Sequence, residues 1–151
     1  MPQVMKIVPF FALLLAILYL LSPDGLGGRF DIFTPINGEV PYNKELFSIE
    51  MKHLGPNEYW APSLASVIIM VGVFFLYLEL HKATRTSDLS VIDHTLSLIV
   101  FVAYFATFLT REWAGNSLFF IISAMAFLDV AAGLTITISG ARRDFNLGGG
   151  H

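Results

Sequence analysis

The sequence predicts an all-α, polytopic membrane protein with four transmembrane helices, and two observations lead to this prediction. First, 55% of its 151 residues are hydrophobic and only 14% are charged, whereas an ordinary soluble domain is about 25% charged. Second, four stretches approach the roughly 20 mainly apolar residues that cross a hydrocarbon core of about 30 Å. These stretches, which we expect to form one domain over 1–151, are residues 4–21, 61–80, 91–110 and 116–139.

The first stretch has features of both a transmembrane helix and a signal peptide. Lys6 provides a weakly basic start, and Pro9 lies close to the beginning, where a missing amide N–H costs least. The segment that follows, LYLLSPDG, lacks the small-x-small pattern of a cleavage site. We therefore expect an uncleaved helix.

The positions of lysine and arginine predict the orientation of the helices. One side of the membrane carries Arg111, in a short turn between the third and fourth stretches, and the 22–60 loop. The basic residues of that loop, Arg29, Lys44 and Lys52, are outnumbered by its acidic residues. We therefore expect that loop outside a bacterial inner membrane, with Tyr59, Trp60 and Trp113 as aromatic anchors, and both termini and the 140–151 tail in the cytoplasm. The short basic elements fall on the cytoplasmic side: Lys6 before the first stretch, His81, Lys82 and Arg85 in the loop expected after the second, and Arg142 and Arg143 after the fourth.

The 22–60 loop is too short for a sizeable core of its own. It opens with the turn-forming cluster SPDGLGGRF, and Asn37-Gly38 is a second turn signal. Residues 45–54 are expected to form a short amphipathic helix with Phe47, Met51 and Leu54 on one face. Such a helix would lie on the membrane surface, cap the bundle or dock a partner.

Asp129 is the most informative residue, because an ionisable side chain inside hydrocarbon costs roughly 2.5–3.5 kcal/mol. Small residues allow a neighbouring backbone to approach closely. We therefore expect the carboxyl group to face a helix contact rather than lipid. Half of its helical neighbours are alanine or glycine: Ile122, Met125, Ala126, Ala132, Gly133 and Ile136.

Folding the third and fourth stretches back at residues 113–114 brings Asp129 to the depth of Ser97. By the helical period, Ser97 shares a stripe with three further polar residues. One interpretation is a neutral Asp129 hydrogen-bonded to Ser97 or a backbone carbonyl, and another is a proton or cation relay. Contact with another subunit, a pigment or a lipid headgroup is a third. The stripe consists of His94, Ser97, Tyr104 and Arg111.

A second cluster is expected near the cytoplasmic edge, where Glu79 falls opposite Asp93 and His94. It is either an interfacial charge cluster that ends both helices or, through a Glu79–His94 pair, a pH sensor.

Composition and motifs exclude several classes of function. With 9 Lys+Arg, 12 Asp+Glu and a net charge of -3, the chain has no basic patch for nucleic acid. The absence of cysteine excludes disulfides and thiolate metal sites. There is no HExxH, repeated Glu-x-x-His, P-loop, GxSxG or GxGxxG. A bis-histidine haem is disfavoured, because His81 and His94 both lie near the membrane edge. The sequence therefore assigns no catalytic residue, metal site or cofactor, and it disfavours an enzyme.

These observations favour a small non-catalytic accessory or assembly subunit of a larger inner-membrane complex. Its partners would be membrane lipids and other membrane-protein subunits or copies of itself. The alternative is a small oligomeric proton-linked transporter or channel that uses Asp129 and the polar stripe. A membrane enzyme that acts on lipids is the third hypothesis.

Overall fold

The computed structural model describes residues 8–53, 55, 58–84 and 90–148, with the backbone alone for 90–91 and 140–148. The described chain is mostly helical, with one small antiparallel hairpin. Its elements are α1 (Phe10–Leu20), η2 (Leu26–Gly28), η3 (Pro41–Asn43), β1 (Ile49–Glu50), β2 (Tyr59–Trp60), α2 (Leu64–Ala83), α3 (Ser90–Thr110), η4 (Glu112–Ala114) and α4 (Ser117–Gly148).

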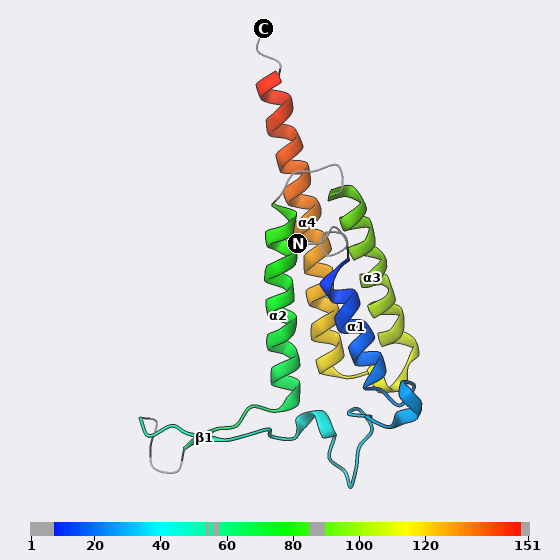
Figure 1. Ribbon diagram of the computed structural model, residues 1–151, viewed down its shortest axis with the longest axis vertical. Helices are drawn as coiled ribbons and strands as arrows, with labels where there is room; N and C mark the ends of the chain where they lie inside the picture. Colours follow the sequence, from blue (N-terminus) through cyan, green and yellow to red (C-terminus); the bar gives the residue numbers. More distant parts are fainter. Residues whose placement is uncertain (1–7, 54, 56–57, 85–89, 149–151) are drawn as a thin grey trace.

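The four α-helices form a bundle in which α4 packs against both α2 and α3 (Figure 1). The short helix α1 contacts α2 and α3. Gly72 permits the close approach of α2 to α4, because a Cβ atom at this position would lie 2.9 Å from Ile122 Cδ1. The buried apolar residues at the centre come from all four helices and include Phe11, Leu14, Leu18, Ile68, Tyr104, Phe119 and Ile122.

Three helices are long and apolar enough to cross a membrane, and they correspond to the second, third and fourth predicted spans. These membrane-length segments are Leu64–Ala83, Ile92–Thr110 and Ser117–Ser139. Their outward faces carry exposed apolar side chains such as Phe74, Val102 and Phe127. The structure thus supports an integral membrane protein.

The first predicted span, residues 4–21, corresponds only in part to a helix in the structure, α1. Helix α1 has 11 residues, a length of roughly 16 Å at 1.5 Å per residue, which is less than the hydrocarbon thickness. It begins directly after Pro9, as expected for a residue that has no N–H to donate. Four crossings are therefore not shown, since residues 1–7, including Lys6, lie outside the described part of the chain.

Helices α2 and α4 both extend beyond their predicted ends. The side chain of Ser63 caps α2 by accepting the N–H of Ser66 at 3.3 Å. His81 and Lys82 belong to the last turn of α2 and not to the following loop, which corrects their assignment. The backbone of α4 is helical through 140–148. The side chains of Arg142 and Arg143, and all of Arg85 and His151, lie outside the described residues.

The prediction of an amphipathic helix over 45–54 is wrong, because this segment contains strand β1. Ile49 pairs with Trp60 and Glu50 with Tyr59, in antiparallel register. The residues at 47, 49 and 51 alternate along an extended chain, so an apolar pattern with period two was mistaken for a helical one. Cross-strand contact between the Phe47 and Trp60 rings, at 5.9 Å between centroids, stabilises the extended form.

The remaining loop folds over the end of the bundle where α3 joins α4. The turn predicted at Asn37-Gly38 is confirmed, since φ is 55° and 87° at these residues and Ile36 bridges Glu39. Phe33 is buried against Trp113, with ring centroids 5.2 Å apart. Trp113, expected to be an interfacial anchor, is thus a buried packing residue, 9% exposed.

Candidate functional site

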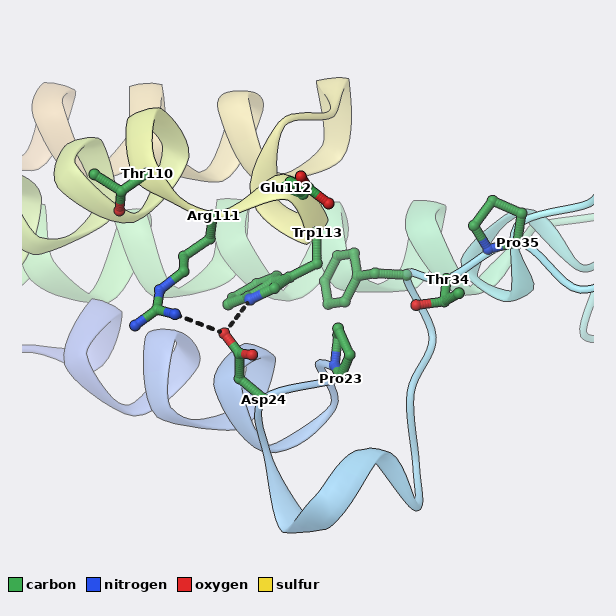
Figure 2. Close-up of a pocket in the computed structure, with 9 residues that line it drawn as sticks. Pro23, Asp24, Thr34, Pro35, Thr110, Arg111, Glu112 and Trp113 are labelled. Carbon is green, nitrogen blue, oxygen red and sulfur yellow. Dashed lines mark hydrogen bonds and ion pairs between the residues drawn. The ribbon is translucent and has the colours of Figure 1, made fainter.

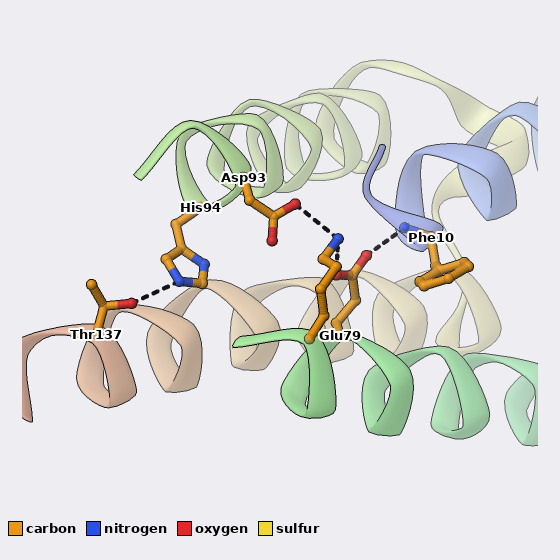
Figure 3. Close-up of polar contacts among 6 residues, drawn as sticks. Phe10, Glu79, Asp93, His94 and Thr137 are labelled. Carbon is orange, nitrogen blue, oxygen red and sulfur yellow. Dashed lines mark hydrogen bonds and ion pairs between the residues drawn. The ribbon is translucent and has the colours of Figure 1, made fainter. Parts of the chain in front are cut away.

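An ion network lies at the end of the bundle where α1 begins, α2 ends and α3 begins, which we call the polar end. Lys82 Nζ lies 2.6 Å from Glu79 Oε2 and 2.8 Å from Asp93 Oδ1 (Figure 3). The side chains of Lys82, Glu79 and Asp93 are only 17%, 1% and 8% exposed. The network therefore consists of two buried ion pairs, one within α2 (Glu79–Lys82) and one that joins α2 to α3 (Lys82–Asp93).

Glu79 also holds the beginning of α1. Its Oε1 atom accepts the backbone N–H of Phe10 at 2.5 Å. The preceding residue, Pro9, makes no side-chain capping bond. A carboxylate at a helix N-terminus satisfies an unpaired N–H and interacts favourably with the helix dipole. Lys82 adds a cation–π contact, with Nζ 5.7 Å from the centre of the Phe10 ring.

His94 contacts α4, and the pair expected with Glu79 is replaced by the Glu79–Lys82 ion pair. His94 Nε2 lies 2.9 Å from Thr137 Oγ1 (Figure 3). Gly133 makes room for the imidazole, because a Cβ atom there would lie 2.6 Å from the ring. The absence of a side chain at Gly133 thus allows α3 and α4 to approach at this level.

Asp129 lies inside the bundle and is 3% exposed, as is Ser97. The two side chains are close enough to interact, and Glu79, Lys82 and Asp93 are near enough to act electrostatically on the Asp129 carboxyl group. The polar end therefore combines ionisable groups from α2, α3 and α4.

Two members of the proposed stripe lie elsewhere. The Tyr104 hydroxyl, fully buried, donates a hydrogen bond to the Phe11 carbonyl at 3.1 Å and so ties α3 to α1. Arg111 follows the end of α3 at the opposite end of the bundle, where its side chain is 56% exposed and pairs with Asp24. The described contacts thus do not join the four stripe residues into one relay.

Sequence reasoning missed Lys82, Thr137 and the Phe10 N–H. The spacing of Glu79 and Lys82, three residues apart, would have placed them on one helix face had α2 been extended to Ala83. Asp129, Gly133 and Thr137 likewise share a face of α4 at intervals of four residues. No sequence pattern indicated the hydrogen bond from the Phe10 N–H to Glu79, because it depends on where α1 packs against α2.

Among the side chains that the structure describes, the charges at the polar end do not balance. Glu79, Asp93 and Asp129 are three acidic groups, and Lys82 already contacts the first two. Burying an uncompensated charge is costly, so Asp129 is stable there as a neutral, hydrogen-bonded acid or beside a bound cation. Among the described residues, no group of three or more His, Asp or Glu side chains has the arrangement of a metal site.

A pocket of about 470 Å³ lies at the other end of the bundle (Figure 2). Asp24 Oδ2 accepts the Trp113 indole N–H at 2.8 Å and lies 3.4 Å from Arg111 Nη1. The volume is within the range for small ligands. Because Asp24 pairs with Arg111 and Glu112 adds a further acidic group, the wall offers no free positive charge. It is lined by Pro23, Asp24, Phe33, Thr34, Pro35, Thr110, Arg111, Glu112 and Trp113.

Comparisons with protein-family models, with curated proteins and with solved structures find no match for this chain. A function must therefore be inferred from the geometry of the molecule itself.

Proposed function

We propose that the protein is a small non-catalytic accessory or assembly subunit of a larger inner-membrane complex. The observation that carries the proposal is the length of α4. Its 32 residues correspond to roughly 48 Å at 1.5 Å per residue, which exceeds a hydrocarbon core of about 30 Å. Its C-terminal end extends past the ends of α2 and α3 (Figure 1).

A helical projection of this kind favours a partner for physical reasons. An isolated helix shorter than about 12 residues is marginal in water, so most of its stability must come from packing on a neighbour. Within the chain, the Lys82–Asp93 ion pair joins α2 to α3, and this is a structural role rather than a catalytic one. A subunit that presents α4 to another protein accounts for both features.

Deletion of residues 140–151 is expected to release the partner and leave the bundle folded. The full chain, purified from its native membrane in mild detergent, should retain a stoichiometric partner that mass spectrometry identifies. The truncated chain should lose that partner, because the projecting end of α4 is gone. Circular dichroism should show the same thermal transition for both chains.

Two results would contradict this proposal. One is a full chain that purifies as a monodisperse species without any other protein. The other is a truncated chain that still retains the partner, which would place the contact on another part of the bundle.

A second candidate function, an oligomeric proton-linked transporter or channel, is favoured by the excess of acidic over basic groups around Asp129 in the described part of the chain. A buried acid without its own cationic partner can take up and release a proton. Four helices seldom enclose a solute pathway, so this candidate requires several copies of the chain.

Asp129→Asn tests the second candidate, because it keeps the shape and hydrogen-bonding capacity of the side chain but cannot titrate. Proton flux into liposomes, followed with a trapped pH-sensitive dye, should be abolished in this variant. Glu50→Gln, an exposed carboxyl group on β1, serves as the control and should retain full flux. Unchanged flux in Asp129→Asn, or none in the parent protein, would eliminate this candidate.

A further inference from the structure

We propose that the two described arms of the 45–60 hairpin, residues 45–53 and 58–60, form a lipid anchor whose apolar face inserts into the headgroup layer beside the start of α2. The hairpin is tied to that helix by several backbone contacts. The Leu64 N–H donates to the Lys44 carbonyl at 3.2 Å, and the Leu46 N–H donates to the Pro62 carbonyl at 3.0 Å. Glu45 forms an isolated bridge with Ser63.

These contacts determine the depth of the hairpin. Leu64 is the first residue of a membrane-length helix, so the base of the hairpin lies at the boundary between hydrocarbon and headgroups. From there the hairpin runs sideways, away from the bundle (Figure 1). The surface that lies beside a membrane helix at this depth is the lipid headgroup layer.

The two faces of the hairpin differ in character. Ile49 and Trp60 are directly paired, so their side chains share one face, and Phe47 lies two residues earlier on that face. These three side chains are 45–50% exposed. The opposite face mixes the polar and charged Ser48 and Glu50 with the exposed Leu46 and Tyr59.

A lipid surface fits this hairpin better than an acidic or basic protein surface would. Aromatic rings are enriched where membrane proteins meet the headgroup layer. A two-stranded hairpin is marginal in water, so an apolar surface beneath it would stabilise it. The charged residues of this segment are Lys52, Glu45, Glu50 and Glu58. With two more acidic than basic groups, the anchor should not depend on anionic lipid.

Spin labels on the two faces test the anchor in the full chain, reconstituted in phosphatidylcholine vesicles. The protein has no cysteine, so Phe47→Cys and Ser48→Cys each provide one labelling site on opposite faces. The label in Phe47→Cys should collide with oxygen, which concentrates in lipid, more than with a water-soluble nickel complex. The label in Ser48→Cys should show the reverse preference. Adding anionic lipid or salt should leave both preferences unchanged.

Trp60 emission provides a second measurement that leaves Phe47 in place. In a Trp113→Phe background, bromine on lipid chains near the headgroups should quench most of the Trp60 emission. Swapping the two aromatic residues, by Tyr59→Trp with Trp60→Tyr, should reduce that quenching severalfold. Equal access of the nickel complex to both labels would overturn the anchor. So would a label in Phe47→Cys that is shielded from both reagents, or quenching that depends on the protein-to-lipid ratio, because each indicates cover by protein.

Discussion

Lys82→Met is expected to lower the free energy of unfolding by about 3–5 kcal/mol, the usual cost of removing one partner from a buried ion pair. Glu79 and Asp93, whose side chains are almost fully buried, would then face each other without a compensating cation. Methionine keeps the length and apolar stem of lysine, so the effect would come from the lost charge. Chemical unfolding in detergent at neutral pH, followed by circular dichroism, measures the change.

Two controls separate electrostatics from packing. Lys52→Met makes the same substitution at an exposed site and should change stability by less than about 0.5 kcal/mol. Combining Lys82→Met with Glu79→Gln and Asp93→Asn removes all three charges and should recover most of the lost stability, as for other buried ion pairs replaced together. A triple variant as unstable as the single one would show that Lys82 acts through packing alone.

Trp113→Ala should also cost about 3–5 kcal/mol, as is typical for truncation of a buried tryptophan. Its ring packs against Phe33 and Phe119, with centroids 5.2 and 5.4 Å away. Its loss would free the loop that Phe33 holds on the bundle, and trypsin should then cleave after Arg29 much faster than in the parent protein. Limited proteolysis with mass spectrometry gives the rate, and unfolding in detergent gives the stability.

Trp113→Phe distinguishes packing from hydrogen bonding at the same position. Phenylalanine keeps an aromatic ring but loses the indole N–H that Asp24 accepts at 2.8 Å. We expect a smaller loss of about 1 kcal/mol, the typical net worth of one hydrogen bond, and little change in cleavage. If Trp113→Ala leaves the cleavage rate unchanged, Phe33 is held by contacts other than the indole.

Much of the helical architecture follows from sequence patterns, because a long apolar run in lipid must satisfy its backbone groups within one helix. That reasoning located the three membrane-length helices. It did not establish the first crossing, since the described helix begins only at Phe10. It failed at 45–54, where Phe47 and Met51 fit both periods and the choice depended on pairing between Ile49 and Trp60.

The candidate site was foreseen only in part. Glu79, Asp93, His94, Ser97 and Asp129 were identified as intramembrane polar residues, and the structure gathers them at one end of the bundle. Lys82 was assigned to a loop because hydropathy ends a helix at the first charges. The Glu79–Lys82 contact was therefore not predicted, although Lys82 is the only lysine or arginine among the described residues that pairs with these carboxylates.

By itself, the sequence determined which segments are helices in an apolar environment and which side chains are costly to leave in lipid, since both depend on local composition. The tertiary structure decided the partner of each polar group. It paired Lys82 with Asp93 on the next helix, set His94 against Gly133 and paired Ile49 with Trp60 in a hairpin. Such choices depend on contacts between distant residues, whose energies no local pattern encodes.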